Sequence, residues 1–156
     1  MEDAGRFAHA PTVWALASEL CRALTDEIGG VGCIVSRVIG DVLVQIAEHA
    51  PEGRTFHLGR GFLVSQFPAT ADVLAGRGAR AVSLAEPDPD PAEAAVLRDL
   101  DVGAVLMLAL RGPAAAWGLV ELYRAAPDAF APADAELATA VVAEAERALA
   151  ALLASR

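Results

Sequence analysis

The sequence contains no lysine and no asparagine, so all 12 of its Lys/Arg-type cations are arginines. Against them stand 21 acidic residues, which give the chain a formal net charge of −9. A charge of this sign repels the phosphates of nucleic acids and the headgroups of anionic lipids. The composition therefore argues against a protein that binds nucleic acid or a membrane surface directly.

Cysteines, aromatic residues and long apolar runs are also scarce. Two cysteines, Cys21 and Cys33, are too few for a disulfide framework, so we expect reduced thiols in a cytoplasmic protein. No apolar run approaches the roughly 18–20 residues that cross a bilayer. The acidic start, Met1-Glu2-Asp3, is unlike the basic start of a signal peptide. Hydrophobic residues still make up 55% of the 156 residues, which is enough for one domain with a single core.

The most apolar part of the chain is organised as a hairpin. Two runs, Val105–Leu110 and Trp117–Tyr123, flank a break at Arg111-Gly112-Pro113. Both runs are too apolar for edge strands, so we expect them in the middle of a sheet that is covered on both faces. In the second run, one face carries Gly118, Val120 and Leu122, which suits packing under helices. The other face carries Trp117, Leu119, Glu121 and Tyr123, a mixture that indicates a polar cavity.

The first half of the chain reads as a helix followed by a meander. We expect residues 1–11 to be a disordered or frayed lead-in and residues 12–154 to form one domain. Apolar residues recur at helical spacing up to Gly29-Gly30, with Thr12 as the N-cap. β-Branched runs and turn residues then predict three strands, at Val31–Ile39, Asp41–His49 and Thr55–Leu58.

The second half alternates short elements with loops and ends in a long helix. A short helix opens at Ser65 or Thr70 and ends at Gly76, and a strand covers Ala81–Leu84. An acidic, proline-rich loop leads to a helix at Ala92–Leu100, with Ala95, Val96 and Leu100 expected inward. After the hairpin, Pro132 suits the first turn of the last helix. Its apolar stripe is formed by Leu137, Val141, Ala145, Ala148 and Leu152.

This order of elements resembles that of a GAF domain from about Thr12 to Leu153. The resemblance is carried also by Gly118 in the last strand and by the spacing of Phe130 and Asp134 before the last helix. It implies an α+β fold: a six-stranded antiparallel sheet with the N- and C-terminal helices on one face. A helical and loop segment covers a pocket on the other face. Family members are regulatory sensors that bind small molecules and often dimerise, commonly beside an output domain or partner protein.

Departures from the family's motifs argue against some of the ligands and activities found in the family. Ala135 stands where cyclic-nucleotide-binding members carry a glutamate, and the asparagine and lysine of that signature are absent. Residues 59–102 contain no cysteine for a covalently attached bilin. Cys21 and Cys33 lie outside the pocket-side segment that carries the cysteines of free methionine sulfoxide reductases. The resemblance therefore implies an unidentified small-molecule ligand, and the sequence predicts no cofactor, metal site or catalytic residue.

Candidate ligand-binding residues come from the last strand and from the glycine-rich segment around Gly59-Arg60-Gly61. Glu121 either holds a ligand's amine or hydroxyl in a wet pocket or pairs with an arginine such as Arg37 or Arg111. Tyr123 and Trp117 either form a stacking wall or fill the core. His57 and Gln66 flank the glycine-rich segment, where Arg60 could bind an anion.

Three functions follow from these residues. The first is a cytoplasmic ligand-sensing domain that dimerises through its terminal helices. The second is a structural dimerisation domain without a ligand, and the third is a small enzyme on the same fold. We expect no enzyme, because no serine lies in a Gly-x-Ser-x-Gly setting and no reactive cysteine or metal cluster is apparent. A pocket lined by Trp117, Glu121 and Tyr123 would favour the first function over the second.

Overall fold

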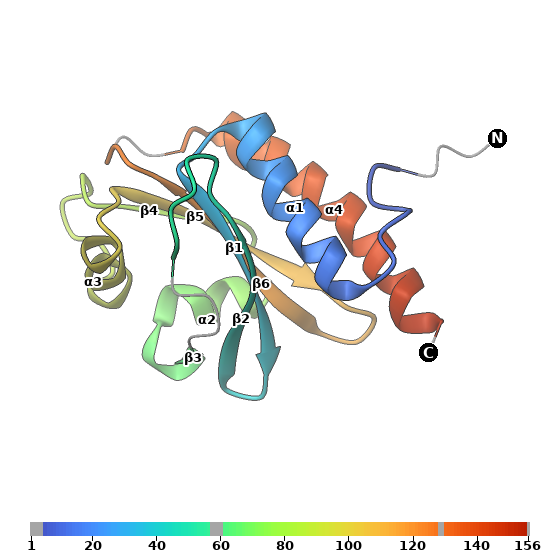
Figure 1. Ribbon diagram of the computed structural model, residues 1–156. Coiled ribbons are helices and arrows are strands. Elements are labelled where there is room, and N and C mark those ends of the chain that lie inside the picture. Colours follow the sequence, from blue (N-terminus) through green and yellow to red (C-terminus); the bar gives the residue numbers. More distant parts are fainter. Residues whose placement is uncertain (1–4, 57–60, 128–129, 156) are drawn as a thin grey trace.

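The computed structural model describes residues 5–56, 61–127 and 130–155. Its strands form one antiparallel sheet in the order β3-β2-β1-β6-β5-β4 (Figure 1). The elements are α1 Val13–Ile28, β1 Gly32–Ile39, β2 Val42–His49, β3 Gly61–Leu63, a 3-10 turn Val64–Gln66, α2 Pro68–Leu74, β4 Arg80–Ser83, α3 Pro91–Asp99, β5 Ala104–Arg111, β6 Ala116–Arg124 and α4 Pro132–Ala154. This six-stranded α+β architecture confirms the predicted fold class.

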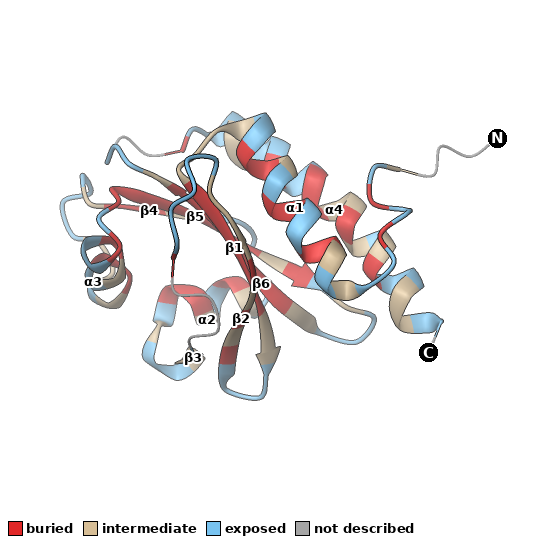
Figure 2. Ribbon diagram, viewed as in Figure 1, coloured by how far each residue is buried: buried red, intermediate tan, exposed pale blue. Residues whose placement is uncertain are grey.

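The centre of the sheet is formed by β1, β6 and β5. Cys33 pairs with Leu122 and Val35 with Val120, both in antiparallel register. The hairpin of β5 and β6 closes through a short turn, and its register shifts after Leu110. These three strands are buried along most of their length because both faces of the sheet are covered (Figure 2).

Helices α1 and α4 lie side by side on one face of the sheet (Figure 1). The Thr12 side chain caps α1 by accepting a hydrogen bond from the Ala15 amide, and Gly29 ends the helix at a φ of 84°. Leu16, Leu20 and Leu24 recur at helical spacing and bury one face of α1 against the sheet. The shared face of the two terminal helices is as predicted.

Most of the apolar stripe of α4 is buried against its own chain. Val141 and Ala145 are buried, together with Ala138, Val142 and Leu149, in the core between α4, α1 and the sheet. Leu137 is 44% exposed, and Ala148 and Leu152 are only partly buried. The surplus of apolar surface on α4 is therefore smaller than the sequence predicts.

The opposite face of the sheet is covered by α2, α3 and the segment around β3 (Figure 1). Asp90 caps α3 by accepting from the amides of Ala92 and Glu93. Leu100 is buried as predicted, but Ala94 and Leu97 form the rest of the inward side of α3, whereas Ala95 is exposed and Val96 half-buried. The prediction was therefore off by about one residue at Ala95 and Val96. A slip of one position rotates a helix face by about 100°.

Two local expectations for the strands need correction. The third strand is Gly61–Leu63, paired with β2, whereas Thr55 and Phe56 are outside any strand and residues 57 and 58 lie outside the described part of the chain. The alternation of β2 breaks at a bulge opposite Val35 and Ser36. Simple alternation would place Ala47 on the face of Gln45, but the bulge turns it to the helix side.

Residues 5–10, from the predicted lead-in, pack against the terminal helices. Phe7 and Ala10 are buried in the core on the helix side of the sheet. Arg6 forms ion pairs with Glu27 of α1 and, at 2.8 Å, with Glu144 of α4. This short segment therefore joins the two helices of that layer.

Candidate functional site

A cavity of about 760 Å³ lies between the sheet and the segments that cover its second face. Strands β1, β2 and β6 form its floor, and β3, α2 and α3 supply its walls. A volume of this size suits a small organic molecule. The described residues that line it are Ser36, Val42, Leu43, Gln45, Gly61, Phe62, Leu63, Gln66, Phe67, Thr70, Ala92, Glu93, Ala95, Val96, Asp99, Leu100, Leu119, Glu121 and Tyr123.

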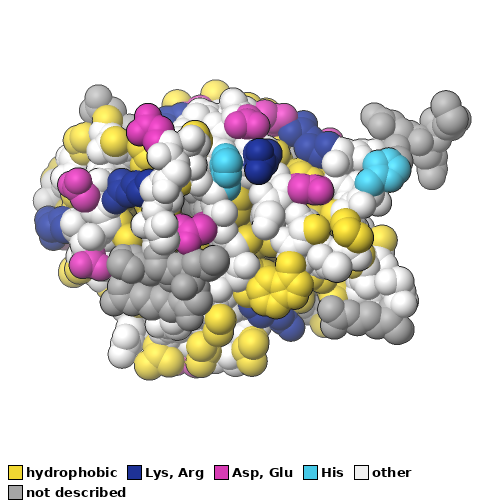
Figure 3. Space-filling model, in the orientation of Figure 1, with side chains coloured by type: hydrophobic (Ala, Val, Ile, Leu, Met, Phe, Trp, Pro, Cys, Tyr) yellow, Lys and Arg dark blue, Asp and Glu magenta, His cyan; other side chains and the backbone are white. Residues whose placement is uncertain are grey.

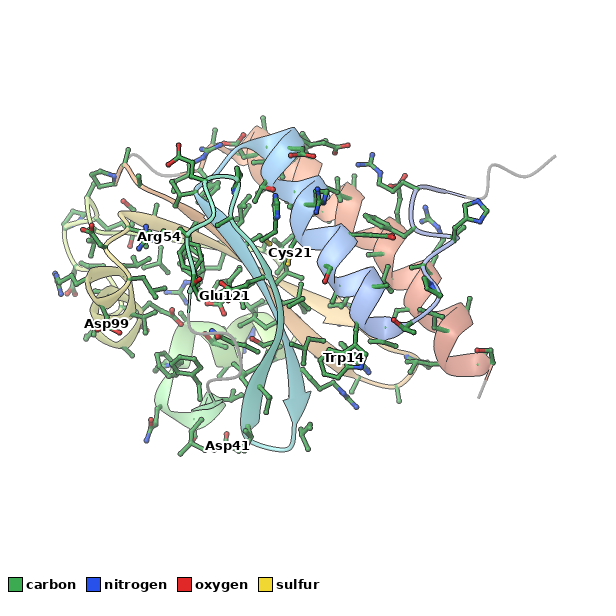
Figure 4. The ribbon with its side chains drawn as sticks, in the orientation of Figure 1. Trp14, Cys21, Asp41, Arg54, Asp99 and Glu121 are labelled. Atoms are coloured by element: carbon green, nitrogen blue, oxygen red, sulfur yellow. The ribbon has the colours of Figure 1, made fainter. Side chains whose placement is uncertain are left out.

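Glu121 lies on the cavity floor, at the middle of β6. Figure 4 shows its side chain in the space between the sheet and the segments over it. The Tyr123 hydroxyl donates a hydrogen bond of 2.9 Å to Oε2 of Glu121. Burial raises the pKa of Glu121 to about 8, the nearby Glu93 carboxylate adds to this rise, and the bond from Tyr123 opposes it. This carboxyl group is therefore protonated for much of the time at neutral pH when no ligand faces it.

Glu93 is the second carboxylate in the cavity and comes from the first turn of α3. It is only 3% exposed, and the Thr70 hydroxyl of α2 donates a hydrogen bond of 2.5 Å to its Oε1. Burial raises the pKa of Glu93, and the hydrogen bond from Thr70 offsets part of the rise. Thr70 thus links α2 and α3 at the point where Glu93 enters the cavity.

Tyr123 is held in place by a stack of rings. It is 2% exposed, and its ring lies parallel to that of Phe56, with centroids 5.5 Å apart. The Arg54 guanidinium lies 4.7 Å from the centre of the Phe56 ring, and the Phe56 amide donates to Glu48 at 2.6 Å. Gly32 makes room for Phe56, because a Cβ at position 32 would overlap the Phe56 ring. This stack fixes the hydroxyl that orients Glu121.

Gln45 adds an unpaired acceptor to the cavity. Its side chain is 7% exposed, and Oε1 has no hydrogen-bond partner among the described residues. A buried amide without a partner costs about 1–3 kcal/mol. The bulge between β1 and β2 lies directly beyond Gln45, which pairs with Ser36, another lining residue. This unpaired atom marks a place where a ligand or water would be stabilised.

Only some of the six predicted site residues are placed by the structure in the cavity. Glu121, Tyr123 and Gln66 line the cavity. Trp117 is not among the lining residues: it packs at the edge of the helix-side core, under the guanidinium of Arg37 at 4.4 Å. The predicted residues His57 and Arg60 lie outside the described part of the chain.

Neither of the arginines considered as a partner for Glu121 has that role. Arg37 donates to the carbonyls of Val38 and Trp117 and covers the Trp117 ring. The Arg111 guanidinium lies beside Gly76, and the Arg111 amide donates to Glu146 of α4. Within the described residues, the hydrogen-bond partner of Glu121 is the Tyr123 hydroxyl. Glu121 is therefore available to interact with whatever occupies the cavity.

Sequence analysis missed Glu93, Thr70 as a site residue, and Gln45. Glu93 follows Asp90-Pro91 and has the pattern of an acidic first turn, which is normally exposed. Gln45 shares an alternating face with Leu43, and a polar residue on a face expected to be buried was a usable signal. Thr70 carried no signal beyond its place at a possible helix start.

The Phe130 and Asp134 pair is explained by the structure of the chain's end. Asp134 Oδ2 accepts from the Ala131 amide at 2.8 Å, which caps α4, and from Arg124 at 3.1 Å. These bonds lower the pKa of Asp134. Arg124 also lies 4.2 Å over the Phe130 ring and donates to the carbonyl of Ile28 at 2.9 Å. The motif therefore joins the end of α1, the end of β6 and the start of α4, away from the cavity.

Neither a metal-binding cluster nor a membrane-spanning helix is found among the described residues. Between residues 5 and 155, leaving aside the gaps at 57–60 and 128–129, no group of three or more His, Cys, Asp or Glu side chains is placed to hold a metal ion. In the same residues, no helix has the length and apolar character needed to cross a membrane.

The sheet order, the terminal helices on one face and the covered cavity on the other define a GAF-like fold. Solved structures with this fold include the chromophore-binding domain of an unusual bacteriophytochrome from R. palustris. It is 13% identical, has a TM-score of 0.79, and the match covers 97% of this chain and 60% of that one. The likeness at this identity shows the shared fold.

Two structures from Stigmatella aurantiaca are also similar. The chromophore-binding domain of a mutant bacteriophytochrome in the Pr state is 17% identical with a TM-score of 0.76, covering 97% of this chain and 57% of that one. The wild-type phytochrome photosensory core module is 19% identical with a TM-score of 0.76, covering 96% and 34%. The chain thus spans 60% or less of the length of these neighbours. No family model and no curated protein sequence matches it.

Proposed function

We propose that this chain is a ligand-sensing regulatory domain that binds a small organic molecule in the cavity over β1, β2 and β6. The observation that carries the proposal is the unpaired, buried Gln45 Oε1 in a cavity of about 760 Å³. A domain whose pocket served only structure would be expected to fill this space and satisfy that atom. The GAF-like neighbours, which are chromophore-binding domains, support a binding role over a catalytic one.

The test is native mass spectrometry of the protein after incubation with a small-molecule extract of bacterial cells. Wild type should gain one ligand mass per chain. Ala92→Phe, which adds a ring at a half-buried lining position, should lose it. Ala114→Phe makes the same change in the exposed hairpin turn and should keep it. No adduct in wild type, or an adduct that persists in Ala92→Phe, would count against the cavity as the site.

We further propose that two copies pair through the outer face of the α1–α4 layer, and that the protein works in the cytoplasm. Trp14 of α1 is 60% exposed and Leu137 of α4 is 44% exposed, so both leave apolar surface on this layer. Figure 4 shows Trp14 at the N-terminal end of α1. The free, buried thiols of Cys21 and Cys33 support a reducing compartment.

Sedimentation velocity at micromolar concentration tests the pairing. Trp14→Glu and Leu137→Glu should each convert a dimer to a monomer, because both place a charge in the proposed interface. Ile39→Glu changes an equally exposed apolar residue in the β1–β2 turn and should leave the dimer intact. A wild-type monomer, or a dimer that only Ile39→Glu disrupts, would refute this interface.

A further inference from the structure

The charged groups that line the cavity are all carboxyl groups, and an unpaired amide oxygen lies among them. Among the lining residues that the structure describes, the charged ones are Glu93, Asp99 and Glu121, and none is an arginine, lysine or histidine. Gln45 adds its unpaired Oε1. The hydroxyls of Thr70 and Tyr123 are already committed as donors to the two glutamates. A ligand that carries hydrogen-bond donors can therefore pair with Gln45 Oε1 and, once Glu121 is ionised, with both carboxylates.

Glu93 and Glu121 are brought together although they come from different elements. Met107 of β5 lies directly opposite Glu121 of β6, and side chains at such paired positions are about 5 Å apart. The Thr70 hydroxyl lies 3.6 Å from the Met107 sulfur and donates to Glu93. Thr70 and Met107 thus connect the two carboxyl groups, which lie near enough for Glu93 to raise the pKa of Glu121. Each has one oxygen bonded by a hydroxyl, and a donor placed between them could reach the other oxygens.

The rest of the cavity is apolar and aromatic. Phe62 and Phe67 meet edge to face, with ring centroids 5.9 Å apart, and both line the wall. Leu43 and Leu119 contribute the apolar part of the floor. Such a wall favours a flat, unsaturated body over a sugar or a polyamine, which would leave its hydroxyl or methylene groups poorly matched. The cavity thus joins an apolar region to an acidic one.

Resting on the proposed function, we infer that this cavity selects an aromatic organic cation, whose amidine-like or amino-heterocyclic N–H groups lie between Glu93 and Glu121. A planar cation of this kind offers two or more N–H donors at once, as needed to bond both carboxylates. It also cancels the repulsion between two acids that share a low-dielectric space. The Gln45 Oε1 accepts a further N–H from the same ligand.

The face of the molecule in Figure 3 carries no acidic patch that would account for a preference for cations. Figure 3 shows acidic, basic and hydrophobic side chains intermingled on the face in view, without a single-sign patch that would collect cations. The net charge of −9 nevertheless attracts any cation weakly over long distances. A test must therefore separate binding in the cavity from this general attraction, which salt screens and a neutral analogue does not experience.

The probes are 2-naphthamidine, its neutral isostere 2-naphthamide and its anionic isostere 2-naphthoate, titrated calorimetrically at pH 8.5 in about 0.15 M salt. The amidine should bind at least about tenfold more tightly than the amide, and the acid should show no binding. Glu121→Gln and Glu93→Gln should each weaken the amidine about tenfold while changing the amide by less than about twofold. Glu52→Gln, which removes an equal charge from an exposed turn, should change neither.

The outcomes separate this inference from the proposed function. Equal affinities for amidine and amide, both lost in Ala92→Phe, would overturn the cation preference and leave a ligand-binding cavity. Amidine binding that Glu52→Gln weakens as much as Glu121→Gln would reduce the effect to the net charge and also overturn the inference. If none of the probes binds but an extract ligand does, the ligand class is wrong. If nothing binds in either experiment, both proposals fail.

Discussion

Replacing Glu121 with glutamine should remove a specific pH dependence of stability. In the folded protein the pKa of Glu121 is raised to about 8 from an ordinary value of 4.5. The folded state thus keeps a proton that the unfolded chain releases, so this stabilisation is complete below about pH 4.5 and lost as the pH rises through 8. At about 1.36 kcal/mol per pH unit, a rise from about pH 5.5 to 8 costs wild type about 3 kcal/mol, and water in the cavity reduces this to about 2 kcal/mol.

The assay is urea unfolding of wild type and Glu121→Gln at several pH values between 5.5 and 8.5, without ligand. The difference between their free energies of unfolding isolates Glu121 together with its coupling to Glu93, because the remaining titrating groups are shared. Wild type should lose about 2–3 kcal/mol relative to the variant across this range. Glu52→Gln, in an exposed turn, should keep the wild-type profile. Parallel profiles for wild type and Glu121→Gln would show that the buried carboxyl group is not protonated, and would refute the reasoning.

Three further predictions concern the fold. Gly118→Ala should cost about 1–3 kcal/mol in urea unfolding, because its Cβ would meet the Ser36 carbonyl oxygen at 2.4 Å; an unchanged midpoint would exclude that contact. Arg124→Gln should lose about 1.5–3 kcal/mol, and Arg124→Lys should recover less than half of it, because lysine cannot bond Asp134 and the end of α1 together. Full recovery by lysine would reduce the role of Arg124 to its charge. Amide hydrogens of residues 61–92 should exchange faster than those of β5 and β6, and equal protection would mean that this segment belongs to the rigid core.

The central part of the fold was predictable because its signals are redundant. The hairpin of β5 and β6 combines two apolar runs with a Gly-Pro break, and α1 has apolar spacing, a Thr12 cap and a glycine stop. Gly118 was expected to allow a helix to approach, and that explanation was wrong: its crowding comes from the backbone of β1 at Ser36. A glycine shows that space is short but not which neighbour takes it.

The site was predictable only where one strand determined it. Glu121 and Tyr123 share a face of β6 by simple alternation, and both line the cavity. In the sequence, Trp117 belongs to the same alternating set. In the structure it lies beside the register shift after Leu110, and the Arg37 guanidinium covers its ring outside the cavity. Glu93 enters from α3 through tertiary packing against Thr70, which no local pattern encodes.

The contact between Gly32 and Phe56 limits how this domain can change over time. The ring that supports Tyr123 occupies the volume in which a side chain at position 32 would lie. Enlarging position 32 alone would expel that ring, and shrinking position 56 alone would leave a void under the tyrosine. The two positions can therefore change only together. Related sequences should show correlated substitutions at these two sites, which are 24 residues apart, and neither site needs to touch the ligand.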